Sequence, residues 1–221
     1  MLKYPCLVLD HDDTVVQSEA TVNYPFFVEY LKECRPGMSI TLHEYISECF
    51  DPGYGSMCRQ RFGFTDEELH REYVGWKAYI QNHIPAPYPG IGRIIRRQKE
   101  EGGIICVVSM SAEENSRRDY RTHFGLEPDT IFGWDMTPEH RKPSPWSLFE
   151  IMRKYSFSPS QLLVLDDTKA ACPMARAAGV KIGFAGWGRR ELPQITAEMN
   201  ALCDFSFDST EALEKFLFEE K

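Results

Sequence analysis

The sequence predicts an α/β fold, a doubly wound parallel sheet with a small all-helical domain inserted into it. Short apolar runs alternate with helix-length segments over residues 89–221, which is typical of parallel strands joined by helical crossovers. Helical periodicity fills residues 17–88. Three of the apolar runs end in carboxylates or a hydroxyl, which favours a ligand site at the carboxyl edge of the sheet.

The first strand is expected at the start of the chain, where Cys6 to Leu9 form a short apolar run. Asp10, Asp12 and Thr14 follow that run directly. An unpaired buried carboxylate costs several kcal/mol, so we expect the two aspartates to face a crevice. Residues 1–16 are therefore assigned to the sheet domain.

A helical insert is predicted over residues 17–88. Apolar side chains recur there at helical spacing, and two helices are preceded by the capping boxes Thr41-x-x-Glu44 and Thr65-x-x-Glu68. Residues 54–64 are interpreted as a loop. Prolines at 85, 87 and 89 predict a stiff connection back to the sheet domain.

The sheet domain resumes at residue 89 and extends to residue 221. A further capping box, Ser111-x-x-Glu114, is expected to begin the helix after the second strand. A helix rich in alanine is expected to stop at Gly179. The apolar runs predict further strands at Ile104–Val108, Thr130–Trp134, Leu162–Leu165, Lys181–Phe184 and Phe205–Phe207.

The composition of the chain limits which partners and which cellular compartment we expect. The 221 residues carry a net charge of −8, which argues against a nucleic-acid surface. Seven cysteines without a Cys-x-x-Cys pair suggest free thiols in a reducing compartment. The first apolar run is too short for a membrane span. We expect a soluble cytoplasmic protein with no nucleic-acid or membrane partner, and nothing in the sequence implies an obligate protein partner.

Polar groups suited to phosphate chemistry follow three of the predicted strands. Asp10 and Asp12 follow the first, Ser109 follows the second, and the pair Asp166–Asp167 ends a third. The carboxyl ends of parallel strands gather at one edge, so these groups can share a site. Two unit charges 4 Å apart repel by about 4 kcal/mol at an effective dielectric of 20. Four carboxylates therefore need a divalent cation there in addition to any lysine.

The ordered motifs resemble those of a known family. Asp10-x-Asp12-x-Thr14, then Ser109, then Lys142-Pro143, then Asp166-Asp167 resemble the four motifs of the haloacid dehalogenase superfamily. The helical insert directly after the first motif resembles the cap of the phosphoglycolate phosphatase-like members. The resemblance implies a Rossmann-like core and a Mg²⁺-dependent phosphatase that hydrolyses a small phosphorylated metabolite.

The resemblance also implies roles for individual residues. Asp10 is expected to be the nucleophile that forms an aspartyl-phosphate, and Asp12 the general acid and base. Mg²⁺ is expected to bind Asp10, the Asp12 backbone carbonyl and Asp167. Ala171 stands where many relatives carry a further acid, and Asp166 is the candidate to replace it. The expected phosphate-binding residues are Ser109, Lys142 and Thr14.

Other functions remain open at this point. Asp12 favours phosphate esters over dehalogenation, because relatives that dehalogenate lack that acid. A phosphotransferase or mutase of the same family would use the same residues. A receiver-like signalling domain also surrounds a phosphorylated aspartate with acidic groups, but the helical insert argues against it. A catalytically silent binding protein is the third alternative.

Overall fold

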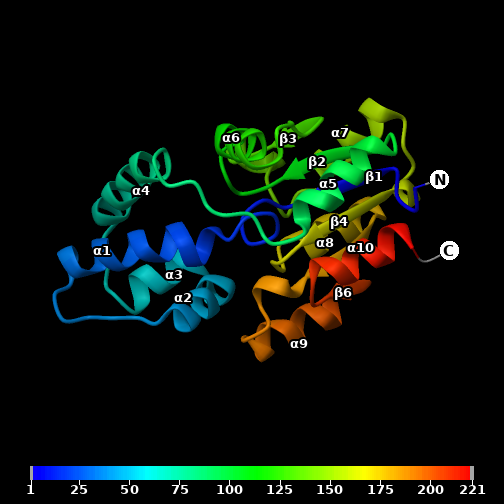
Figure 1. Ribbon diagram of the computed structural model, residues 1–221. Coiled ribbons are helices and arrows are strands. Elements are labelled where there is room, and N and C mark those ends of the chain that lie inside the picture. The colour runs from blue at the N-terminus through cyan, green and yellow to red at the C-terminus, as the bar shows by residue number, and fades with distance from the viewer. Residues whose placement is uncertain (1, 220–221) are drawn as a thin grey trace. The chain divides into compact units, whose positions relative to one another are not determined.

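A computed structural model describes residues 2–219 of the chain (Figure 1). The chain forms two compact units. The core unit comprises Met1–Val16 and Pro87–Lys221, and the helical unit comprises Gln17–Ala86. Within residues 2–219, no helix is both long enough and apolar enough to cross a bilayer.

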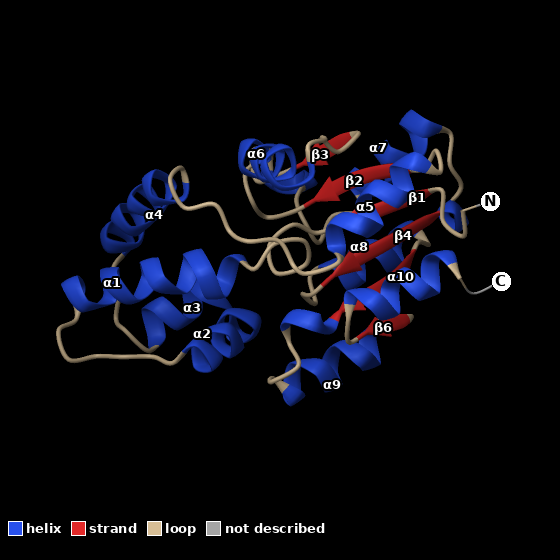
Figure 2. Cartoon of the chain, viewed as in Figure 1, coloured by secondary structure: helices blue, strands red, loops and turns tan. Residues whose placement is uncertain are grey.

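The core unit contains a parallel sheet, drawn in red in Figure 2. Over the described residues it has six strands in the order β3-β2-β1-β4-β5-β6. The predicted parallel α/β fold is confirmed, including the last two strands. The strands are β1 (Cys6–Leu9), β2 (Ile104–Val108), β3 (Thr130–Phe132), β4 (Leu162–Asp166), β5 (Lys181–Ala185) and β6 (Phe205–Phe207).

Strand β1 is central, because it pairs in parallel with both β2 and β4. Leu9 is in register with Val107 on one side and Leu165 on the other. The backbone N–H of Asp10 continues the pairing by donating to the Leu165 carbonyl at 2.8 Å. The polar residues that follow the three strands therefore lie at one edge of the sheet.

Helices cover both faces of this sheet (Figure 2). Leu7 and Leu9 face one layer, in a buried cluster with side chains of α5, α6 and α10. Cys6 and Val8 point to the opposite face, as alternation along a strand requires, and α7 and α8 belong to that side. The helices are α5 (Ile91–Glu100), α6 (Glu113–Phe124), α7 (Trp146–Tyr155), α8 (Ala171–Ala178), α9 (Pro193–Leu202) and α10 (Thr210–Phe218).

The helical unit packs around an aromatic centre. Phe27 is buried, and its ring lies 5.2 Å from that of Tyr45 and 5.6 Å from that of Phe62, measured between centroids. Both capping boxes predicted for this unit, at Thr41 and Thr65, are present. Its α-helices are α1 (Tyr24–Cys34), α2 (Leu42–Glu48), α3 (Tyr54–Gln60) and α4 (Asp66–Ile80).

Two local predictions were wrong. Residues 54–60 form α3 and are not a loop, because Met57 and Cys58 are buried on the inner side of that helix. Ser111 does not cap α6, whose N-cap is Ala112 without a side-chain hydrogen bond. The carboxylate of Asp135 accepts from the first N–H of α6 at 2.8 Å instead. A residue distant in sequence thus provides a side-chain acceptor for an N–H of the first turn, although this N–H belongs to Glu113 and not to Glu114, as the capping box predicted.

Candidate active site

Three carboxylates meet at the carboxyl edge of the sheet. Oxygen atoms of Asp10, Asp166 and Asp167 all lie within 4.8 Å of one another. Asp10 is 6% exposed, and Asp166 and Asp167 are each 1% exposed. Asp10 directly follows β1, Asp166 is the last residue of β4, and Asp167 follows it. The two strands are adjacent. Burial of three acids in one place requires compensating positive charge or hydrogen bonds.

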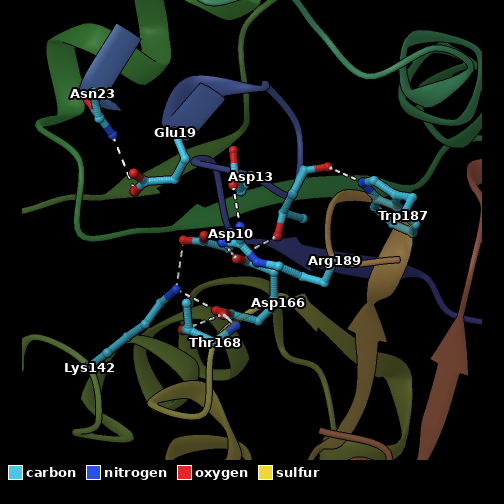
Figure 3. Close-up of polar contacts among 11 residues, drawn as sticks. Asp10, Asp13, Glu19, Asn23, Lys142, Asp166, Thr168, Trp187 and Arg189 are labelled. Atoms are coloured by element: carbon cyan, nitrogen blue, oxygen red, sulfur yellow. Dashed lines mark hydrogen bonds and ion pairs between the residues drawn. The ribbon is translucent and has the colours of Figure 1, made fainter. Parts of the chain in front are cut away.

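Lys142 supplies part of that charge. Its Nζ lies 2.7 Å from Oδ1 of Asp10 and 2.5 Å from Oδ2 of Asp166 (Figure 3). Burial alone would lower the pKa of Lys142, but the two carboxylates outweigh it and raise that pKa. Burial also raises the pKa of Asp10, and the ammonium of Lys142 opposes the shift. Lys142 therefore stays protonated and links Asp10, after β1, to Asp166, at the end of β4.

The other oxygen of Asp166 is also occupied. Its Oδ1 accepts from the backbone N–H and from the hydroxyl of Thr168, both at 2.8 Å. Figure 3 shows these contacts beside the one to Lys142. Both oxygens of Asp166 thus have protein partners, which fixes the orientation of the carboxylate.

Asp167 is held by two different partners. Its Oδ1 accepts from the Thr14 hydroxyl at 3.3 Å, and its Oδ2 accepts from the guanidinium of Arg189. Burial raises the pKa of Asp167, and the charge of Arg189 opposes this effect. Thr14 therefore contacts the acidic cluster through Asp167 and is itself fully buried.

Sequence reasoning missed Arg189, which is 5% exposed. It bridges two buried acids, because it also lies 2.7 Å from the carboxylate of Asp13. The turn Gly186–Gly188 that precedes it follows β5, and Trp187 Nε1 donates to the Thr14 carbonyl at 3.1 Å. The available signal was a cationic residue just beyond another strand of the same parallel sheet.

Two predicted residues lie at this edge outside the network of contacts just described. Ser109 follows β2, and its Oγ accepts from the N–H of Ser111 at 3.1 Å. Asp12 is half-buried in the turn after β1, where its backbone pairs with that of Val16. Within residues 2–219, no side-chain hydrogen bond or ion pair occupies the Asp12 carboxylate.

His11 has a partner that the sequence did not predict. Its Nε2 lies 3.0 Å from Oδ2 of Asp119 on α6, and both residues are buried. The other oxygen of Asp119 lies 2.7 Å from the guanidinium of Arg118. The contact between His11 and Asp119 connects the turn that carries Asp10 and Asp12 to α6. We therefore infer that His11 positions this turn.

The charges of the site fit a divalent cation. Four buried carboxylates (Asp10, Asp13, Asp166, Asp167) face two buried cations, Lys142 and Arg189, among the residues described at this edge. The balance is therefore two negative charges before a phosphate is added. Carboxylate oxygens are the donors that Mg²⁺ prefers. The donor set and the net charge both suit such an ion.

The fold and this acidic strand-end site define a class of α/β hydrolase with an inserted helical unit. The chain belongs to the haloacid dehalogenase-like hydrolase family, whose model matches residues 7–185. It is 30% identical over 140 residues to a phosphoglycolate phosphatase of Aquifex aeolicus. That match covers 59% of this chain and 65%, slightly less than two thirds, of the relative.

Solved structures share the fold over nearly the whole chain. A family hydrolase from Deinococcus radiodurans, with bound phosphate and sodium, has a TM-score of 0.75 at 16% identity and covers 99% of each chain. CbbY from Rhodobacter sphaeroides, in complex with xylulose-1,5-bisphosphate, has a TM-score of 0.71 at 21% identity and covers 95% of each chain. At these identities the likeness establishes the fold.

Proposed function

We propose that the protein is a divalent-metal-dependent phosphomonoesterase that acts through an aspartyl-phosphate on Asp10. The observation that carries this proposal is the position of Asp10 at the end of β1. There its carboxylate is bound by Lys142 and surrounded by the acidic cluster with Asp166 and Asp167. A carboxylate nucleophile needs a neighbouring cation to stay ionised when buried, and Lys142 supplies one.

Two aspartates divide the chemistry. A carboxylate oxygen of Asp10 attacks phosphorus, and the bond from phosphorus to the ester oxygen breaks. Asp12 delivers a proton to that oxygen, so the alcohol leaves neutral. Water then attacks the phosphorus of the aspartyl-phosphate, Asp12 takes its proton, and phosphate is released. The Asp12 carboxylate has no protein partner among the described residues, which suits a group that exchanges protons with substrate and water.

The remaining residues bind and orient. Lys142 and Ser109 hold oxygens of the phosphoryl group, and Thr14 contributes by fixing Asp167. Mg²⁺ would be held by Asp10, the Asp12 backbone carbonyl and Asp167, where it supplies charge neutralisation for the phosphoryl group. Asp166 has both oxygens bound by Lys142 and Thr168 and contributes negative charge to the acidic cluster.

The substrate is proposed to be a small phosphorylated metabolite in the cytoplasm, with the helical unit as the cap that selects it. The curated relative is a phosphoglycolate phosphatase, and CbbY was solved with a sugar bisphosphate. A panel of 2-phosphoglycolate, sugar phosphates and nucleoside monophosphates would identify the leaving group by the ratio of kcat/KM values.

The test is turnover of p-nitrophenyl phosphate with and without Mg²⁺. We expect activity that requires the metal and is abolished in Asp10→Asn. Asp208→Asn changes an exposed acid of the same unit and should leave the rate unchanged. Rapid acid quenching with a ³²P-labelled substrate should give an acid-stable, hydroxylamine-sensitive phosphoprotein only when Asp10 is present. Full activity in Asp10→Asn would reject the assigned nucleophile.

A further inference from the structure

Two cysteines of the core unit lie side by side on the sheet face opposite the Leu7–Leu9 cluster. Cys172 is in the first turn of α8, and Cys203 follows the last residue of α9. Their Sγ atoms are 3.8 Å apart although the residues are 31 positions apart in sequence. Both are free thiols.

This pair is accessible to small molecules. Cys172 and Cys203 both line a surface pocket of about 290 Å³, together with Arg176 and Lys181. Cys203 is half-buried, and Cys172 reaches the pocket with little exposed area of its own. A small polar oxidant that enters this pocket therefore meets both cysteines.

The chain contains a matched pair that is closed to solvent. Sγ atoms of Cys6 and Cys106 lie 4.0 Å apart across β1 and β2. Both residues are fully buried in the sheet. The two pairs have nearly the same sulfur separation and differ in access, so Cys6 and Cys106 are an internal control.

We propose that Cys172 and Cys203 form a peroxide-sensitive dithiol, with Cys172 as the thiol that is oxidised and Cys203 as the thiol that resolves it. This is a modification site separate from the acidic edge and independent of the proposed phosphatase activity. A pair of neighbouring thiols that lines a surface pocket is suited to transient oxidation in a reducing compartment.

The chemistry needs a hydroperoxide as the oxidant. The Cys172 thiolate attacks one oxygen of hydrogen peroxide, the O–O bond breaks, and Cys172 becomes a sulfenic acid. The hydroxide that leaves takes up the proton lost when the Cys172 thiol ionised and is released as water. Cys203 then attacks the sulfur of that acid. A disulfide forms, and the sulfenic hydroxyl leaves with the proton of Cys203 as a second water. Two electrons pass from the thiols to the peroxide, and a thiol reductant restores both.

The surroundings favour this division of roles. The hydrogen bond with Cys203 is the largest effect on Cys172 and lowers its pKa. Burial and the charge of Asp166 oppose this effect, and Arg176 on the same helix adds to it. The same hydrogen bond and burial raise the pKa of Cys203. The position of Cys172 at a helix N-terminus acts in the same direction as Arg176. Cys172 is thus the better thiolate, and Cys203 retains the proton.

Little movement is required to form the bond. A disulfide needs a sulfur separation of about 2.05 Å, and rotation of the two side chains can supply much of the approach from 3.8 Å. Cys203 lies beyond the C-terminus of α9 in an irregular connection to β6. Its backbone N–H donates to the Met199 carbonyl of α9 at 3.0 Å, so we expect the approach to come from the side chains and not from the backbone.

The experiment treats the full-length protein with hydrogen peroxide, blocks remaining thiols with N-ethylmaleimide in denaturant, and maps tryptic peptides by mass spectrometry. We expect the wild type to lose two of its seven alkylatable thiols. Peptides 170–176 and 191–215 should be found joined by a disulfide that dithiothreitol reverses. Cys6 and Cys106 should remain reduced and should therefore both be alkylated by N-ethylmaleimide.

Two variants assign the roles. In Cys203→Ser, dimedone should trap a sulfenic acid on Cys172. In Cys172→Ser, Cys203 should stay alkylatable, and dimedone should not label it. If all seven thiols remain alkylatable in the treated wild type, or if its disulfide joins other cysteines, the proposal is overturned. Preferential dimedone labelling of Cys203 would overturn the order of oxidation. Should a variant not fold, the wild-type map alone decides whether the pair exists.

Discussion

Arg189 and Asp167 form a buried ion pair at the carboxyl edge of the sheet, and the same guanidinium binds Asp13 at 2.7 Å. An arginine side chain stays charged at all accessible pH values. Asp167 is therefore held in place by a permanent cation of the protein itself. One consequence is that stability and metal binding should be coupled at this residue.

The first prediction concerns Arg189→Met. Removing the cation leaves two buried carboxylates without their partner, which typically costs about 3–5 kcal/mol of the free energy of unfolding. We expect such a loss in EDTA and a smaller loss in saturating Mg²⁺, because the ion replaces part of the positive charge that Asp167 has lost and so binds the variant more tightly than the wild type. Urea denaturation in both buffers measures it. Arg190→Met is the control, since Arg190 is exposed and contacts a backbone carbonyl. Equal losses with and without metal would contradict the coupling.

The second prediction concerns Lys142→Met. Loss of one preorganised donor to a developing negative charge typically lowers kcat by about 10²–10³-fold. We expect a decrease of that size with p-nitrophenyl phosphate. Lys169→Met is the matched control, because Lys169 is near in sequence to Asp167 but interacts with Glu198 at 3.4 Å. If the two variants lose activity equally, Lys142 is not the specific phosphate ligand.

The third prediction separates a side chain from its backbone. In the proposed site Asp12 contributes its carbonyl to the metal and its carboxylate to proton transfer, whereas Asp167 contributes its carboxylate to the metal. Asp12→Asn should lower turnover by about 10²–10⁴-fold while the Kd for Mg²⁺ changes little. Asp167→Asn should weaken Mg²⁺ binding itself. Calorimetric titration of each variant with Mg²⁺ distinguishes them, and strong loss of binding in Asp12→Asn would argue against this division.

The acidic edge was predictable because it depends on topology. Once β1 and β4 are recognised as parallel strands, their carboxyl ends must lie at one edge. The pairing of β1 with β4, which the structure shows, then makes Asp10 and Asp166 neighbours. The same reasoning predicts only which edge Ser109 reaches. The direction of the Ser109 hydroxyl depends on the turn to Ser111. The sequence contains no pattern that predicts the geometry of such a turn.

The contacts of Arg189 and Asp135 were not predictable in the same way. Each depends on where a connecting turn places one side chain in space, Arg189 after β5 and Asp135 after β3. A motif of four residues suggested Ser111 as a helix cap, yet the first turn of this helix is capped by Asp135, which accepts from the Glu113 N–H 22 positions away. Tertiary contacts can thus replace a local capping pattern at the start of a helix.

The last prediction concerns the acid stability of the helical unit. The Glu68 carboxylate accepts two hydrogen bonds from Arg35, at 2.8 and 2.9 Å, and one from the backbone N–H of the N-cap residue Thr65 at 2.8 Å. These contacts, the Arg35 bond first, lower the pKa of Glu68 to about 2 from 4.5. A carboxyl with a lowered folded-state pKa stabilises the fold above its unfolded pKa, and that stability is lost as the pH falls toward the folded value.

Glu68→Gln keeps the capping group but removes the charge. We therefore expect it to unfold at lower urea than the wild type at neutral pH, and we expect the difference to narrow between about pH 4.5 and pH 2. Circular dichroism during urea titration at several pH values measures this. Glu67→Gln, an exposed change on the same turn, should show no such narrowing. A difference for Glu68→Gln that is constant across this pH range would mean that the ion pair with Arg35 does not contribute through its charge.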